Sequence, residues 1–184
     1  MPVICAGWAM SCVSLPDGSR QILSFTLPGE LVDAALIFEP VQNYIIEAIT
    51  DVQYRTFNRN ELTQFLSNHP GAFESIARVW VEEKTRADRL IVDLGRRSAE
   101  ERIARLIVHL VKRIKARGMA ASDLEQVSFP LRHHHIADAT GLTLVHVSKV
   151  LSDLRRRKIL ALGGRSLSIL DPIALYRVAG EQMP

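Results

Sequence analysis

The sequence predicts an α+β protein whose strand-rich first part is followed by a long helix and then by a helix-turn-helix with a hairpin after it. Three observations lead to this prediction. Short apolar segments separated by turn residues fill residues 5–57. Apolar residues then recur every seven positions from Phe73 to Leu94, and residues 132–170 pass from two short helical patterns to two short extended ones.

Composition sets the first limits on the class of protein. The 184 residues and 20.6 kDa fit one large domain or two small ones. No apolar run reaches the roughly 18 residues that span a bilayer, and we see no secretory signal. Cys5 and Cys12 are the two cysteines, which excludes a disulfide framework and favours a reducing cytoplasm. We expect them to pack as small apolar residues, and a redox role for the pair stays open.

Charge is distributed unevenly along the chain. Residues 1–75 contain three basic and eight acidic residues, so their net charge is 3 − 8 = −5. The remaining residues contain 23 − 3 = 20 basic and 20 − 8 = 12 acidic residues, a net charge of +8. A basic second part is typical of a protein that binds a polyanion, although ordinary variation in surface charge explains the same numbers.

The first part is expected to contain about four strands. Residues 5–15 and 21–27 form a hairpin around the turn residues Pro16-Asp17-Gly18, and residues 43–49 and 52–57 form a second pair. Four strands are fewer than a sandwich or a barrel usually needs. Either the other strands are absent from this chain or a partner covers the open edge.

The middle of the chain is expected to be helical. Asn58 or Asn60 caps a short helix that ends near Asn68, and Pro70 begins a long helix that Gly95 ends. The seven-residue repeat of this helix predicts pairing with a second copy, while packing on its own domain is the alternative. Glu83 falls on the same side and weakens the repeat. The expected dimer interface consists of Phe73, Ile76, Trp80, Ala87, Leu90 and Leu94, with Ala77 and Ile91 in neighbouring positions.

The next helix begins at a capping box. The Ser98 side chain and the Glu101 carboxylate satisfy free backbone N–H groups at the start of a helix that ends near Arg117, before Gly118. Residues 118–130 are expected to form a loop with an extended piece over residues 127–129.

Residues 133–157 form the predicted helix-turn-helix. Residues 133–140 make a short helix, residues 141–143 a tight turn, and residues 144–157 a second helix that Thr143 caps. Ala137 permits a close crossing of the two helices, Gly141 takes the positive φ of the turn, and Val147 is buried between them. Residues 159–162 and 167–170 then form a two-residue hairpin around Gly163-Gly164, which completes a winged helix.

A winged helix predicts binding to double-stranded DNA. The second helix lies in the major groove with the side chains of its N-terminal half toward the bases. The side chains expected to be exposed there are Thr143, Leu144, Val145, His146, Lys149 and Ser152. Lys149 is the candidate for a guanine contact, whereas Thr143, His146 and the wing residue Arg165 are expected at phosphates. The basic run Arg155-Arg156-Arg157-Lys158 either contacts phosphate or simply ends the helix favourably in solvent.

The sequence resembles the Crp–Fnr family of transcription regulators. The stretches that carry the resemblance are Gly7-Trp8-Ala9, Leu15-Pro16-Asp17-Gly18, residues 21–25, residues 27–31, residues 99–103 and residues 136–154, and they cover nearly the whole chain. The resemblance implies a partial β-roll of the cyclic-nucleotide-binding type over residues 1–69, a dimerisation helix over 70–97 and a winged helix-turn-helix over 98–184. It also implies a cytoplasmic homodimer on a palindromic DNA site, contacts with RNA polymerase, and DNA-backbone contacts from His133 and His134.

Several departures from the family limit these implications. Members usually have further strands ahead of the point where this chain begins. Gly29-Glu30 resembles the phosphate loop of members that bind cyclic AMP, but residues 40–44 lack their arginine motif, so we expect no cyclic nucleotide. Two cysteines cannot hold the four-cysteine iron–sulfur cluster of other members, and we expect no cofactor. Val145 and Lys149 replace the usual glutamate and arginine of the recognition helix, so the DNA sequence that is read differs.

Other functions have less support in the sequence. His133-His134-His135 point in different directions on a helix and do not converge on one metal ion. No phosphate loop, nucleophile elbow or metal-ligand spacing indicates an enzyme. The main alternative is a small-molecule receptor with a pocket in the β-roll and a C-terminal part that contacts proteins.

Overall fold

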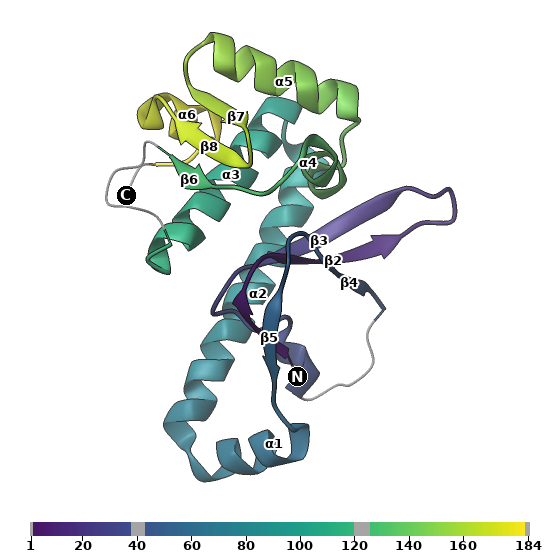
Figure 1. Cartoon of the computed structure of the whole chain (residues 1–184), viewed down its shortest axis with the longest axis vertical. Coiled ribbons are helices and arrows are strands. Elements are labelled where there is room, and N and C mark those ends of the chain that lie inside the picture. Colours follow the sequence, from purple (N-terminus) through teal and green to yellow (C-terminus); the bar gives the residue numbers. More distant parts are fainter. Residues whose placement is uncertain (1, 38–42, 120–125, 183–184) are drawn as a thin grey trace. The chain divides into compact units, whose positions relative to one another are not determined.

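The computed structural model describes residues 2–37, 43–119 and 126–182, which divide into two compact units. Unit 1 is Met1–Ile91 and unit 2 is Val92–Pro184. Each unit is described by itself. Figure 1 shows the elements of both, coloured along the chain. No helix in the described ranges combines the length and the apolar character needed to cross a bilayer.

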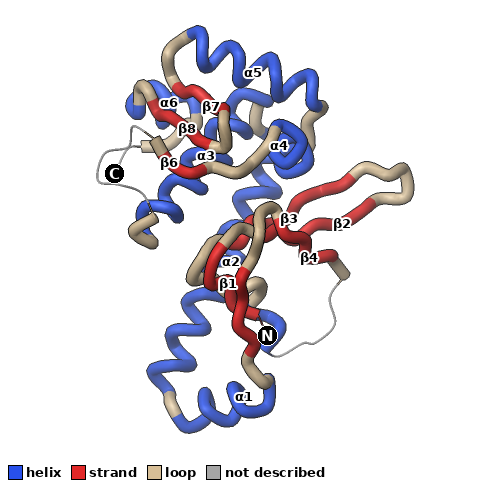
Figure 2. The backbone as a smooth tube through the Cα atoms, in the orientation of Figure 1, coloured by secondary structure: helices blue, strands red, loops and turns tan. Residues whose placement is uncertain are grey.

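Unit 1 contains two small antiparallel sheets. One pairs β1 with β5, and the other has the order β3-β2-β4. The bounds are β1 Pro2–Ala6, β2 Ala9–Ser14, β3 Arg20–Thr26, β4 Ile45–Ala48 and β5 Gln53–Thr56, and a short 3-10 helix, η1, spans Ala34–Ile37. The hairpin predicted around Pro16-Asp17-Gly18 is confirmed as β2 and β3, which Figure 2 shows as two adjoining strands.

Two predictions about these strands are wrong. Residues 5–15 are two strands, because Gly7 has φ +82° and bends the chain between β1 and β2. A Cβ at Gly7 would lie 2.0 Å from the carbonyl oxygen of Asp51, so no other residue fits this bend. The segments near residues 45 and 55 do not pair with each other either. Instead, β4 pairs with β2 and β5 with β1, a long-range choice that local pattern does not encode.

The two cysteines therefore lie on different strands. Cys12 on β2 is buried, as expected for a small apolar residue, whereas Cys5 on β1 is exposed. The expectation that both are buried is wrong for Cys5, because side chains alternate between the two faces of β1 and the preceding Ile4 is the one that is buried.

The middle helices begin where the sequence predicts. The Asn58 side chain accepts hydrogen bonds from the backbone N–H groups of Asn60 and Glu61, and this caps α1 (Arg59–Asn68). Helix α2 spans Pro70–Arg96, so Gly95 lies inside its last turn and does not end it. None of the 27 residues of α2 is fully buried, which is unusual for so long a helix.

In unit 2 the other three helices pack on α3 (Ala99–Ala116), and one of these helices, α5, also contacts a three-stranded sheet. Its other elements are α4 His133–Thr140, α5 Leu144–Arg156, α6 Pro172–Val178, and the strands β6 Val127–Ser128, β7 Leu160–Gly163 and β8 Ser166–Ile169, in the sheet order β6-β8-β7. The predicted capping box is present, with the Ser98 and Glu101 side chains bonded to each other's backbone N–H. The loop prediction for residues 120–125 lies outside the described residues.

Two features of unit 2 differ from the sequence predictions. Helix α6 was not predicted, although Asp171 followed by Pro172 is a usual start: the Asp171 carboxylate accepts the Ala174 N–H at 2.9 Å. The turn of the β7–β8 hairpin is Gly164-Arg165 rather than Gly163-Gly164, because Gly163 pairs with Ser166. Both turn residues have φ near 60° (59° and 60°), as a two-residue turn of this hand requires.

Candidate nucleic-acid interface

Helices α4 and α5 form the predicted helix-turn-helix. Ala137 and Val147 are both buried, and Gly141 has φ +63° in the turn between the helices. The Gly141 and Leu142 N–H groups both bond to the Ala137 carbonyl oxygen, which closes the end of α4. The small alanine, the left-handed glycine and the buried valine therefore have the structural roles that the sequence predicted for them.

The starts of the two helices are capped differently. The Thr143 hydroxyl accepts the His146 N–H at 3.3 Å and caps α5, as predicted. At α4 the backbone N–H of Arg132 donates to Nδ1 of His135 at 3.1 Å, and the His135 side chain is buried. His135 thus has a structural role, and within the described residues no group of three metal-ligating side chains exists.

The residues expected to be exposed on α5 are exposed. Val145 has an exposed fraction of 79% and Leu144 of 53%, which are high values for aliphatic side chains. Among the sequence-predicted DNA contacts only His134 is partly covered. The exposed members of that set are His133, Thr143, Leu144, Val145, His146, Lys149, Ser152 and Arg165.

One hydrogen bond joins the two helices on their exposed side. Nδ1 of His133, the first residue of α4, lies 3.1 Å from the hydroxyl oxygen of Ser148 on α5. Nothing in the local sequence indicates that Ser148 meets His133, because their proximity depends on the crossing of the helices.

The basic run at the end of α5 is partly neutralised inside unit 2. Nη1 of Arg157 donates to Asp153 at 3.1 Å and also to the Glu100 carboxylate, and Arg156 donates to Asp153. A hydrogen bond from Arg157, and a smaller contribution from the hydrogen bond of Arg156, hold the pKa of Asp153 below its usual value. Arg156 and Arg157 therefore stabilise the end of the helix, whereas the exposed side chains of Arg155 and Lys158 have no ion-pair partner in the described chain.

The wing is tied to the rest of unit 2 at its turn. The Phe129 N–H donates to the carbonyl oxygen of Arg165 at 2.9 Å, directly after β6, while Phe129 itself is buried. The Arg165 side chain is exposed on this anchored turn. A guanidinium held on a fixed hairpin suits a phosphate contact.

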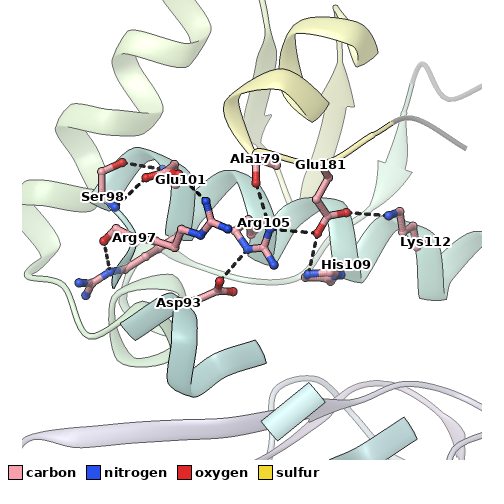
Figure 3. Close-up of polar contacts among 10 residues, drawn as sticks. Asp93, Arg97, Ser98, Glu101, Arg105, His109, Lys112, Ala179 and Glu181 are labelled. Atoms are coloured by element: carbon pink, nitrogen blue, oxygen red, sulfur yellow. Dashed lines mark hydrogen bonds and ion pairs between the residues drawn. The ribbon is translucent and has the colours of Figure 1, made fainter. Parts of the chain in front are cut away.

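A polar cluster that the sequence analysis missed joins the last turn of α2, α3 and the C-terminal segment (Figure 3). Arg105 lies at its centre. Its Nε donates to Asp93 at 2.6 Å and its Nη1 to the Ala179 carbonyl oxygen at 3.1 Å, and Nη1 lies 3.4 Å from a Glu181 carboxylate oxygen. Glu181 also pairs with Lys112 at 2.7 Å. Arginine on the inner face of an amphipathic helix was the available signal for this cluster.

Glu181 is charged in this cluster. Burial alone would raise the pKa of its carboxyl group, but the hydrogen bond from Lys112 and the electrostatic interactions with His109, Lys112 and Arg105 outweigh burial and lower it. Nε2 of His109 lies 3.0 Å from the Glu181 carboxylate. The cluster thus fixes the residues after α6 against α3, the helix on which α4 and α5 also pack.

In unit 1 the carboxylate of Glu83 on α2 accepts the Ala34 N–H at 3.2 Å, at the start of η1. Burial raises the pKa of Glu83, partly offset by that hydrogen bond, and the nearby carboxylate of Asp33 adds to the rise. Glu30 is buried and accepts the Leu27 N–H at 2.8 Å. This side of unit 1 therefore concentrates negative charge. Residues 40–42, which replace the arginine motif, lie outside the described residues.

Comparison with known proteins agrees with this geometry. A family model, the Crp-like helix-turn-helix domain, matches residues 101–178. The nitrogen fixation regulation protein FixK of Bradyrhizobium diazoefficiens is 33% identical over 165 residues, which are 90% of this chain and 68% of that protein. The transcriptional activator protein Anr of Pseudomonas protegens is 31% identical over 176 residues, 94% of this chain and 70% of that protein.

Solved structures show the same fold. FixK2 of Bradyrhizobium japonicum superposes with a TM-score of 0.83 at 27% identity, over 100% of this chain and 87% of that one. A transcriptional regulator of the CRP family from Thermus thermophilus superposes with a TM-score of 0.76 at 28% identity, over 100% of this chain and 89% of that one.

The chain is thus a two-unit protein with a β-roll-type part, a long helix and a winged helix-turn-helix. It belongs to the Crp–Fnr family of transcription regulators and carries the helix-turn-helix DNA-binding domain of that family.

Proposed function

We propose that the protein is a sequence-specific regulator that binds a palindromic DNA site as a homodimer, with α5 of each copy in the major groove. The observation that carries this proposal is the exposed N-terminal half of α5, on a capped helix that a buried Val147 holds against α4. Side chains exposed on an otherwise anchored helix are available to base edges.

The exposed residues divide by chemistry into base and phosphate contacts. The Lys149 ammonium suits the O6 and N7 atoms of guanine, and the apolar Leu144 and Val145 suit the methyl group of thymine. Thr143, His146 and Arg165, with His133 and His134 at the start of α4, are the side chains that we assign to phosphate contacts, which position the protein. Arg155 and Lys158 provide further positive charge for the DNA backbone.

The dimer is supported by the exposure of α2. Phe73 and Trp80 have exposed fractions of 49% and 53%, and Ala87 is exposed as well. Together with the half-covered Ile76, Leu90 and Leu94, these side chains make the expected seam. A helix that leaves aromatic residues in water at seven-residue spacing gains stability by pairing with a copy of itself. The proposed domains follow the sequence analysis, residues 1–69, 70–97 and 98–184.

The small-molecule receptor is the second candidate. In described unit 1 a cavity of about 320 Å³ is lined by Thr63, Leu66, Ser67, Pro70 and Phe73. It has no charged lining group to orient a ligand. The negative charge around Glu30, Asp33 and Glu83 also opposes a cyclic phosphate. We therefore propose that the protein regulates transcription without binding a cyclic nucleotide. As the family resemblance implies, we also propose that it is cytoplasmic and contacts RNA polymerase at the promoters that it regulates.

Selection of bound duplexes from a random pool tests the proposal. We expect enriched sequences with two inverted half-sites whose centres lie about one helical turn apart, roughly 10 base pairs. Binding to the enriched duplex should exceed binding to a scrambled duplex by about 10³-fold or more at physiological salt. Equal affinity for the two duplexes would contradict sequence-specific regulation.

A further inference from the structure

The hydrogen bond between His133 and Ser148 places an imidazole on the exposed side of the helix-turn-helix. Both residues are exposed, and the bond of 3.1 Å uses Nδ1 of the ring. Nε2 is therefore the ring nitrogen that remains for an external partner, since no other described residue bonds to this side chain. The bond also holds the ring between the first turn of α4 and the middle of α5.

A hydroxyl partner makes this arrangement independent of the protonation state. When the imidazole is neutral, the Ser148 hydroxyl can donate to Nδ1, and the ring proton is then on Nε2. When the imidazole is protonated, Nδ1–H donates to the same hydroxyl oxygen, and Nε2 keeps its proton. In both states Nε2–H is an outward donor. Protonation changes the charge of the ring but not the atoms that it presents.

We propose that His133, positioned by Ser148, is a proton-linked contact to a DNA phosphate, so that acidification tightens DNA binding. This inference rests on the proposed function and adds a form of regulation to it. A phosphate oxygen accepts Nε2–H in either state and attracts the charged ring more strongly. Histidine is the side chain whose charge ordinarily changes within the physiological pH range.

The sign of the effect follows from the negative charge of the bound phosphate. Lys149 and His146 are exposed on α5, and Arg132, His134 and Asp138 are the charged or titratable neighbours on the α4 side. From α3, Arg102 donates to the Thr140 carbonyl oxygen at the other end of α4. A bound phosphate favours the charged form of the His133 ring. Binding therefore takes up a proton, and affinity rises as the pH falls until the ring is charged in the free protein as well.

Salt titrations at two pH values test the proposal with the full chain and a random duplex. Histidine side chains ordinarily gain their charge between about pH 8 and about pH 5.5. The slope of log affinity against log salt should then become steeper by about 0.9 for each His133 that contacts a phosphate. His133→Gln should reduce this steepening by that amount and leave the part due to His134 and His146, the other histidines proposed at phosphates. His69→Gln, which changes an exposed histidine of unit 1, is the matched control and should retain the full steepening.

Ser148→Ala tests the positioning role separately. It leaves His133 in place but frees the ring, so the pH-dependent steepening should decrease while binding at about pH 8 stays within about threefold of the wild-type value. Circular dichroism checks that each variant keeps its helices. An unchanged pH response in His133→Gln would overturn the proposal and assign the effect to another histidine. An unchanged response in Ser148→Ala would overturn the positioning role. Absence of DNA binding by the wild type at both pH values would instead reject the proposed function.

Discussion

Arg105 on α3 and Asp93 in the last turn of α2 form an ion pair of 2.6 Å with both side chains largely covered. Because Asp93 and Arg105 belong to the same compact unit, the pair makes the end of α2 part of the DNA-binding unit. The chain between them leaves α2 after Arg96 and enters α3 at the Ser98 capping box. The boundary between the units therefore lies inside α2 and not at the break that a glycine suggests.

Removing Asp93 should destabilise unit 2. Asp93→Ala leaves the covered Arg105 guanidinium with Glu181 and the Ala179 carbonyl oxygen as its remaining partners among the described residues. We expect a loss of about 2–3 kcal/mol in the free energy of unfolding. Asp88→Ala on the same helix breaks an exposed pair with Lys84 and should cost less than about 0.5 kcal/mol. Urea unfolding followed by circular dichroism measures both. Similar losses for the two variants would show that burial adds nothing to the Asp93 pair.

Gly7→Ala should be far more disruptive than Gly18→Ala. Both glycines have φ near +80° (82° and 83°), so alanine introduces the same backbone strain of about 1–2 kcal/mol at each position. Only at Gly7 would the added Cβ also meet a backbone oxygen, at 2.0 Å, whereas nothing lies within 4 Å at Gly18. The thermal midpoint of unit 1 should fall much further for Gly7→Ala. Equal midpoints would contradict the close approach of Asp51.

Glu83→Gln should stabilise unit 1 at neutral pH. The pKa of Glu83 is raised above its ordinary value of 4.5, chiefly by burial, so folding favours the protonated form. The contribution of this group is therefore fully present below about pH 4.5 and is lost as the pH rises through its raised value. Glutamine keeps an acceptor for the Ala34 N–H without the charge. We expect a gain below about 1 kcal/mol at pH 7, after solvent screening.

The pH dependence provides the control for Glu83→Gln. Near pH 4 the wild-type carboxyl is largely neutral, so the difference between the two proteins in urea unfolding should shrink toward zero. A difference that is the same at both pH values would mean that the side-chain amide, and not the loss of charge, changes the stability.

Trp80→Lys should dissociate the proposed dimer. Trp80 lies on the same side of α2 as Phe73 and Ala87. A lysine at this central position would place one positive charge from each copy in the apolar interface between the two helices. Ser75→Lys adds the same group on a different side of the helix, at an exposed residue, and should leave the dimer intact. Sedimentation equilibrium measures the mass of each variant. A wild-type protein that sediments as a monomer would contradict the dimer itself.

Lys149→Met should weaken binding to the selected duplex more than to a random duplex. Loss of a guanine contact is expected to cost about 1–3 kcal/mol and to relax preference at one base pair of each half-site. Lys115→Met changes an exposed lysine in the last turn of α3 and should leave both affinities unchanged. If Lys149→Met weakens the two duplexes equally, Lys149 contacts phosphate and does not read a base.

Local chemistry predicted the helical half of the molecule well. The predicted roles of the capping residues Asn58, Ser98 and Thr143, of the left-handed Gly141 and of the buried Val147 are all confirmed. Each role depends on residues that lie only a few positions away in the chain. Asp171-Pro172 is an equally local signal for the start of a helix, but α6 was not predicted from it. The positions of the β7–β8 turn and of the end of α2 were predicted wrongly for a common reason. Strand pairing at the turn and helix packing at the end of α2 outweigh the tendency of a glycine to end an element.

By itself, the sequence determined the order of the helices up to α5, the helix-turn-helix and the side chains that its second helix exposes, since periodicity and caps act over one or two turns. Only the tertiary structure decided that β4 pairs with β2 and β5 with β1, that His133 meets Ser148, and that Arg105 gathers Asp93 and Glu181. These contacts join residues that are distant in the chain. Their geometry follows from how whole elements pack, which no local pattern of residues specifies.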